Sequence, residues 1–145
     1  MRFKLAMLAA LGALTLTGCA ASGPAPTSVK LDIAGTANMN GGAPAKIKVY
    51  YLASTGTFRS SDFFQVFNTP EATLGPDLIA VDEFQLSPGR TVTDSRNFPT
   101  APGAIGVVAA FRDIDSAKFL DVRQLAPNTA NTVRVVVSGK SVSIR

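Results

Sequence analysis

The alternation of apolar and polar side chains constrains the fold of this chain more than any other feature. It runs through residues 29–33 and again through residues 46–51, where every second side chain is apolar. Successive side chains of a β-strand point to opposite faces, so a period of two predicts strands with one buried face. An amphipathic helix would instead repeat its apolar residues every three or four positions.

Further strands are predicted towards the C-terminus. Residues 104–111 are continuously apolar with small residues interleaved, which predicts a central strand with little room on one face. Residues 132–137 and 142–144 alternate and flank Ser138 and Gly139, a pair that predicts the turn of a β-hairpin. About seven such strands in about 115 residues predict an all-β chain that folds as a two-sheet β-sandwich.

One strand changes phase. Ile79 and Val81 alternate on one face, whereas Phe84 and Leu86 fall on the opposite one. One extra residue in the strand, as in a β-bulge, returns all four side chains to a single buried face. We therefore expect a bulge near residues 82–83.

A short helical insertion interrupts the strands. Phe63, Val66 and Phe67 recur at helical spacing, and the serines at residues 60–61 are available as the N-cap. Pro70 is expected to end this helix. The aromatic side chains are most simply explained as core residues packed against a sheet.

The first eighteen residues have the pattern of a bacterial export signal. Arg2 and Lys4 precede an apolar run over residues 5–16. As a helix this run would be roughly 18 Å long, which is too short for a bilayer core of about 30 Å. Residues 1–18 are therefore predicted to be a signal peptide.

The segment around Cys19 resembles a bacterial lipobox. The small residues Thr17 and Gly18 precede the cysteine, which is the only one in the chain. The resemblance implies that Cys19 is acylated, with palmitate among its lipids, and becomes the new N-terminus after cleavage. Ala20 implies sorting to the outer membrane, and residues 19–28 are expected to form a flexible tether. The alternative is an ordinary secretory signal in which the cysteine occurs by chance.

The composition excludes most enzyme classes. The chain has no His, so it lacks the commonest general base and every Ser/His or Cys/His nucleophile pair. Its one Cys allows neither an internal disulfide nor a Cys-based zinc cluster. Asp113, Asp115 and Asp121 do not have the spacing of a calcium-binding loop. We expect no catalytic residue, no cofactor and no bound metal.

The charge gives little support for a nucleic acid as partner. Removal of Arg2 and Lys4 with the signal lowers the number of Lys and Arg from 14 to 12, against 10 Asp and Glu. The chain also has no run of basic residues. We therefore expect no binding to nucleic acid.

The order of motifs after Cys19 resembles the outer-membrane lipoproteins of type VI secretion systems, the TssJ (SciN, VasD-like) family. Each motif is weak alone, but together they cover almost the whole chain after the signal. In order they are Asn38-Met39-Asn40, residues 47–52 (IKVYYL), Phe58, Asp62-Phe63, Leu74-Gly75, Asp77-Leu78, Phe84-x-Leu86-x-Pro88-Gly89 and residues 105–112 (IGVVAAFR). The family's Trp-Arg pair after the last motif is replaced here by Lys118-Phe119.

The resemblance implies a transthyretin-like β-sandwich over residues 29–145, held by lipid at the periplasmic face of the outer membrane. Its implied partner is the periplasmic C-terminal domain of the IcmF-like inner-membrane subunit, TssM. With TssM and TssL it would form the trans-envelope complex that anchors the secretion machine. The implied role is structural and not enzymatic.

The resemblance implies that the partner is bound mainly by the loop between the first two strands. By position, this loop runs from Ala37 to Ala43, and its candidate binding residues are Asn38, Met39, Asn40, Gly41 and Gly42. The asparagines offer donors and acceptors, Met39 is an adaptable apolar anchor, and the glycines allow a backbone to approach closely. The alternative is a simple connection in which glycine serves the turn.

A second hypothesis for the whole protein remains open at this point. It is a stand-alone periplasmic or surface lipoprotein with an immunoglobulin-like or carbohydrate-binding sandwich. Exposed aromatic platforms would favour it, but the chain has two Tyr and no Trp.

Overall fold

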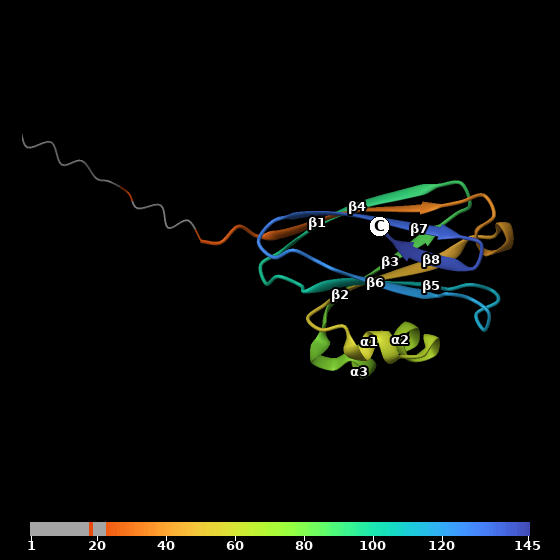
Figure 1. The fold of residues 1–145 in the computed structure, drawn as a ribbon, viewed down its shortest axis with the longest axis horizontal. Helices are drawn as coiled ribbons and strands as arrows, with labels where there is room; N and C mark the ends of the chain where they lie inside the picture. The colour runs from red at the N-terminus through yellow and green to blue at the C-terminus, as the bar shows by residue number, and fades with distance from the viewer. Residues whose placement is uncertain (1–17, 19–22) are drawn as a thin grey trace, which may run out of the picture.

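The computed structural model describes residue 18 and residues 23–145, and within them the chain forms eight strands in two sheets (Figure 1). One sheet has the order β4-β1-β7-β8 and the other the order β3-β2-β5-β6. The expected two-sheet β-sandwich is confirmed. The strands are β1 (Thr27–Gly35), β2 (Ala45–Leu52), β3 (Leu78–Leu86), β4 (Thr91–Phe98), β5 (Ala104–Ala109), β6 (Leu120–Gln124), β7 (Ala130–Ser138) and β8 (Ser141–Ile144).

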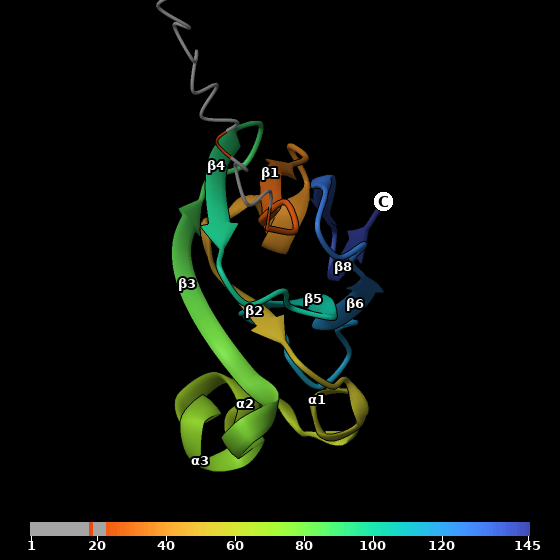
Figure 2. The same cartoon turned by 90° about the vertical axis from the view of Figure 1, so that its left-hand side faces the viewer.

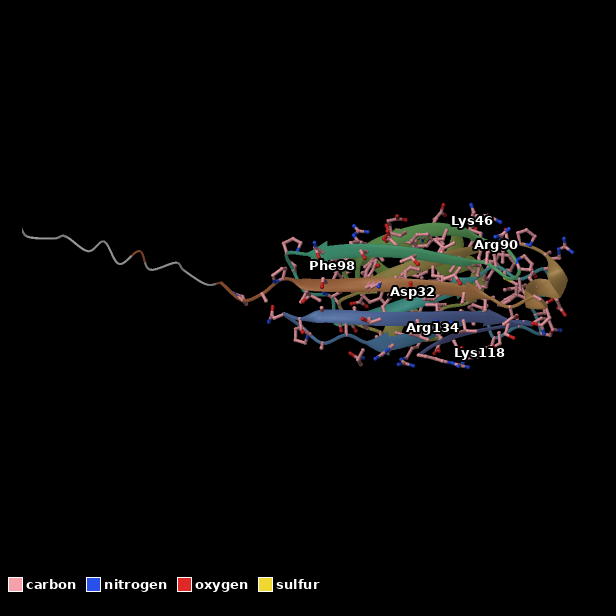
Figure 3. All side chains as sticks on the ribbon, turned by 90° about the horizontal axis from the view of Figure 1, so that it is seen from above. Asp32, Lys46, Arg90, Phe98, Lys118 and Arg134 are labelled. Atoms are coloured by element: carbon pink, nitrogen blue, oxygen red, sulfur yellow. The ribbon has the colours of Figure 1, made fainter. Side chains whose placement is uncertain are left out.

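The main core lies between the two sheets. The alternating residues of β1 bury Val29, Leu31 and Ile33, while Lys30 on the same strand is exposed. Apolar residues from β2, β5 and β7 complete this cluster. On the outer side of the β4-β1-β7-β8 sheet, polar side chains such as those of Asp32 and Arg134 cover the strands (Figure 3). The alternation of apolar and polar residues in β1 therefore corresponds to a sheet with one buried face and one exposed face.

Three short helices cover the outer face of the other sheet (Figure 2). They are α1 (Gly56–Ser60), α2 (Phe63–Asn68) and α3 (Pro70–Leu74), followed by the 3-10 turn η2 (Gly75–Asp77). The helical insertion is therefore longer than the sequence indicated. It builds a second apolar cluster, in which the Phe58 ring takes up the space that a side chain at Gly106 would need.

Two hydrogen bonds hold α2 on β2. The buried hydroxyl of Tyr50 donates to the carbonyl of Val66 at 2.8 Å, and Lys48 Nζ donates to the carbonyl of Phe67 at 2.7 Å. Burial raises the pKa of the Tyr50 hydroxyl, which keeps it a neutral donor. The position of α2 is thus fixed relative to the sheet.

The boundaries of α2 and α3 differ from the expectation. The N-cap of α2 is Asp62, whose carboxylate accepts a hydrogen bond from the backbone N–H of Gln65 at 2.9 Å, and not a serine at 60–61. The Gln65 side chain accepts in return from the backbone of Asp62, which completes a capping box. Pro70 begins α3 instead of only ending α2, because proline suits the first turn of a helix.

The prediction of a bulge near residues 82–83 is wrong about its position. The register of β2 and β3 shifts between Tyr51 and Leu52, near the start of β3. No phase correction is needed at the centre of β3, since both faces of this sheet are covered. Val81 packs under the helices and Phe84 packs in the main core.

The C-terminal hairpin of β7 and β8 is confirmed, but its turn lies one residue later than expected. Ser138 pairs with Ser141, so Gly139 and Lys140 form the turn. Gly139 has a φ of 57°, a left-handed conformation that glycine adopts without strain.

The four connections β1–β2, β3–β4, β5–β6 and β7–β8 gather at one end of the sandwich, which we call the distal end. β1 begins at the opposite end, where the described N-terminal segment enters (Figure 1). Among the described residues, no helix combines the length and the apolar character that crossing a bilayer requires.

Candidate protein-binding site

The distal end carries a hollow of about 390 Å³ between three of its connections. The β1–β2 loop forms one side, and the β5–β6 loop and the β7–β8 turn form the others. Its lining residues are Asn38, Asn40, Gly41, Arg112, Asp113, Gly139 and Lys140. The candidate loop therefore does not act alone, because residues far away in the sequence complete the surface.

Met39 lies in the main core and is fully buried. Its thioether occupies the space in which a Cβ at Gly35 would stand, so the glycine makes room for it. The expectation that Met39 anchors a partner directly does not fit this position. Its apolar side chain instead fixes the base of the β1–β2 loop to the body of the protein.

Asn40 joins three connections. Its backbone N–H donates to the carbonyl of Gly139 at 2.7 Å, and its Nδ2 donates to the carbonyl of Pro44 at 3.0 Å. Its Oδ1 accepts from the backbone N–H of Arg112 at 2.8 Å. Asn40 is buried and has a φ of 48°, a region that asparagine tolerates better than most residues. The loop is thus held in one shape.

The exposed part of the β1–β2 loop includes Asn38, Gly41 and Gly42, together with Ala37 and Pro44. Both glycines have positive φ values, 64° and 80°, and a Cβ on either would meet nothing within 4 Å. The loop therefore presents bare backbone to solvent. A neighbouring chain is able to approach this backbone closely and form hydrogen bonds to it.

The charged residues of the hollow come from the other two connections. Lys140 Nζ contacts Asp113 at 2.8 Å, and Ser116 Oγ donates to the same carboxylate at 2.6 Å. These hydrogen bonds lower the pKa of the Asp113 carboxyl below its ordinary value. The side chain of Arg112 is exposed beside this pair. Sequence reasoning missed Arg112 and Lys140 as site residues, because no local motif connects them to the β1–β2 loop.

Replacement of Asn40 by alanine is expected to lower the free energy of unfolding by about 2–3 kcal/mol. It removes two side-chain hydrogen bonds, and alanine tolerates a positive φ less well than asparagine does. Asn40→Gly removes the same hydrogen bonds, but glycine adopts a positive φ without strain. The free energy of unfolding should therefore fall by about 1 kcal/mol less than in Asn40→Ala. Urea denaturation of both variants measures the difference. Equal losses would contradict the role of the left-handed backbone.

The fold and this surface define a class of protein. It is a small two-sheet sandwich with a helical cover on one face and a preformed hollow among its end loops, and no group of metal-ligating side chains occurs in the part that the structure describes. The model of the family described as "Type VI secretion lipoprotein, VasD, EvfM, TssJ, VC_A0113" matches residues 27–140. The chain belongs to this family, as its motifs indicated.

Solved structures share the fold. The T6SS lipoprotein TssJ1 from Pseudomonas aeruginosa is 27% identical, with a TM-score of 0.78 over 83% of this chain and 95% of that one. Serratia marcescens Lip, described as a membrane bound component of the Type VI Secretion System, is 24% identical, with a TM-score of 0.75 over 83% and 96%. A chain in a structure described as the T6SS protein TssM C-terminal domain from EAEC is 24% identical, with a TM-score of 0.66 over 81% and 97%. No curated protein matches the sequence closely enough to add a relative.

Two further features singled out in the sequence are Cys19 and the pair Lys118-Phe119. Cys19, the expected lipidation site, lies outside the described residues. Phe119, one of the two residues in place of the family's Trp-Arg pair, packs against both apolar clusters, and its ring lies edge-on to Phe63 at 5.6 Å. Lys118 lies 4.0 Å from Asp121, and its backbone pairs with β8.

Proposed function

We propose that this protein is the outer-membrane lipoprotein of a type VI secretion membrane complex. Acylated Cys19 anchors it to the periplasmic face of the outer membrane, and residues 19–26 form the tether. This is two residues shorter than the sequence indicated, because Thr27 and Ser28 belong to β1 and Thr27 is buried. The distal end binds the periplasmic C-terminal domain of the IcmF-like subunit TssM, which shares the complex with TssL. The protein is an anchor that catalyses no reaction.

The positions of the tether and the hollow support this proposal most directly. The described segment ahead of Thr27 joins the sandwich at the start of β1, and the three connections that line the hollow lie at the opposite end (Figure 1). β1 has nine residues, which span about 30 Å as a strand. An anchor at one end therefore presents the binding surface away from the membrane, towards a partner that rises from the inner membrane.

The family and its relatives support the identity of the partner. The family is one of type VI secretion lipoproteins. A chain with the same fold occurs in the structure described as the TssM C-terminal domain. The β1–β2 loop is also suited to binding a partner, because Asn40 holds it in one conformation. Such a loop loses little conformational entropy on binding. Attachment of both partners within the same narrow periplasm also raises their effective concentration.

The substitution Asn38→Arg tests the binding surface. It places a long charged side chain on the exposed loop without entering the core, so binding to the TssM periplasmic domain is expected to weaken more than tenfold, or by about 1.4 kcal/mol. Biolayer interferometry with immobilised TssM domain measures the affinity.

The matched control is Asn97→Arg. Asn97 is exposed on β4 and pairs with Ser28 at the opposite end of the sandwich, so the same substitution adds the same charge away from the hollow. Its affinity for TssM should equal that of the unmodified protein. An unchanged affinity for Asn38→Arg, or an equal loss for both variants, would place the interface elsewhere.

A further inference from the structure

Phe64 is the most exposed large apolar side chain in the described part of the chain, with 61% of its surface accessible. It lies on α2, and its ring meets that of Phe63 edge-on at 5.3 Å. A single exposed aromatic residue is common on protein surfaces. This one adjoins a second hollow, which the binding surface proposed above does not include.

The second hollow has a volume of about 260 Å³ and lies between the start of α2 and the β5–β6 connection. Most of its lining is apolar. We call it the aromatic groove, and its lining residues are Asp62, Phe63, Phe64, Ile114, Asp115, Ala117 and Phe119. Its size is sufficient for one large apolar side chain.

The walls of the groove are fixed before any partner arrives. Asp62 caps α2, and the ring of Phe63 stacks on Phe67 at 4.9 Å. Phe119 meets Phe63 at 5.6 Å from the opposite wall. On the β5–β6 side, the bonds from Ser116 and Lys140 to Asp113 hold the loop in place. A ligand would therefore enter an existing groove.

The charged residues of the aromatic groove are both acidic. Asp62 uses one carboxylate oxygen for the cap of α2, which leaves the other oxygen for a ligand. The carboxylate of Asp115 is exposed, and within the described residues it takes part in no hydrogen bond or ion pair. The neighbouring distal hollow differs, because Arg112 and Lys140 contribute positive charge there.

We propose that the aromatic groove is a docking site for a protein segment in which an aliphatic or aromatic side chain stands next to a lysine or arginine. The apolar side chain covers Phe64 and fills the groove, and the cation pairs with Asp115. Opposite charges at the rim select and orient such a segment, while the buried apolar contact supplies most of the affinity. An anionic lipid surface fits less well, because both carboxylates would repel it.

A pair of peptides tests this proposal. One carries Lys-Leu-Phe-Arg between Gly-Ser spacers and a fluorescent label, and the other has Glu in place of both cations. Anisotropy is measured with the full-length protein in non-ionic detergent, and empty micelles give the background. The cationic peptide is expected to bind at least about tenfold more tightly than the acidic one. Phe64→Ala and Asp115→Lys should each weaken the cationic peptide at least about fivefold.

Two control variants define the location. Ile79→Ala truncates the other exposed large apolar side chain of the described residues, which lies outside the groove, and should leave peptide binding unchanged. Asn38→Arg should also leave it unchanged, so a failure of this proposal is distinct from a failure of TssM binding. The proposal is overturned by equal affinity for both peptides, by no binding up to about 1 mM, or by equal effects of Phe64→Ala and Ile79→Ala. Binding of phosphatidylglycerol vesicles that depends on Phe64 would overturn it in favour of a lipid surface.

Discussion

Replacement of Phe58 by alanine is expected to lower the free energy of unfolding by about 3–5 kcal/mol, the range typical of a fully buried aromatic residue. Phe58 is inaccessible to solvent, and its ring packs on the backbone of Gly106 and lies 5.1 Å from the ring of Tyr50. The truncation therefore leaves a cavity between the helices and the sheet. The rigid strands β2 and β5 form its wall and restrict collapse.

Urea denaturation of Phe58→Ala and of the unmodified protein measures the loss in free energy of unfolding. Phe64→Ala is the matched control. Phe64 lies in the same helical insertion but is largely exposed, so its truncation should change stability by no more than about 0.5 kcal/mol. Gly106→Val tests the same contact from the other side, because its side chain would overlap the Phe58 ring. A loss below about 1 kcal/mol for Phe58→Ala would contradict the packing of α1 on the sheet.

The substitution Cys19→Ser is expected to have a large effect on membrane association, because it removes the thiol that would accept the lipid. The variant should leave the membrane fraction, lose incorporation of labelled palmitate and fail to support secretion. Each buried methylene of an acyl chain contributes about 0.8 kcal/mol, and stable anchoring requires more than one chain. Cell fractionation and metabolic labelling measure these outcomes.

The folded domain should not be affected by this change, since both apolar clusters are drawn from residues after 28. The melting temperature of Cys19→Ser is therefore expected to equal that of the unmodified protein. Ser22→Ala, a substitution of similar size nearby, should retain membrane association and palmitate. Retention of Cys19→Ser in the membrane fraction with normal secretion would contradict the anchoring role.

The strands with one clear apolar face were predictable from the sequence, whereas β4 and β6 were not predicted. The inward positions of β4 include Arg96, which forms an ion pair with Asp82 of β3 at 2.8 Å. The guanidinium also lies over the rings of Tyr51 and Phe98, at 5.5 and 5.2 Å from their centroids. A strand that uses a charged pair at the edge of the sandwich has too few alternating apolar residues to be recognised by its period.

The candidate site was predictable only in part for a related reason. The run Asn40-Gly41-Gly42 is a local signal for positive φ, and the structure has all three residues in that region. The burial of Met39 and the contributions of Arg112 and Lys140 depend on how distant strands are arranged. Pattern and spacing along the chain carry no information on such contacts.

The place of β1 within its sheet has a mechanical consequence. β1 is an inner strand, paired antiparallel with β4 and parallel with β7 along almost its whole length. A pull on the chain ahead of Thr27, resisted by a grip on the distal loops, acts along this strand. The backbone hydrogen bonds on both of its sides are then loaded in shear and must break together instead of one at a time. This geometry resists extraction of the strand far better than peeling from an edge would.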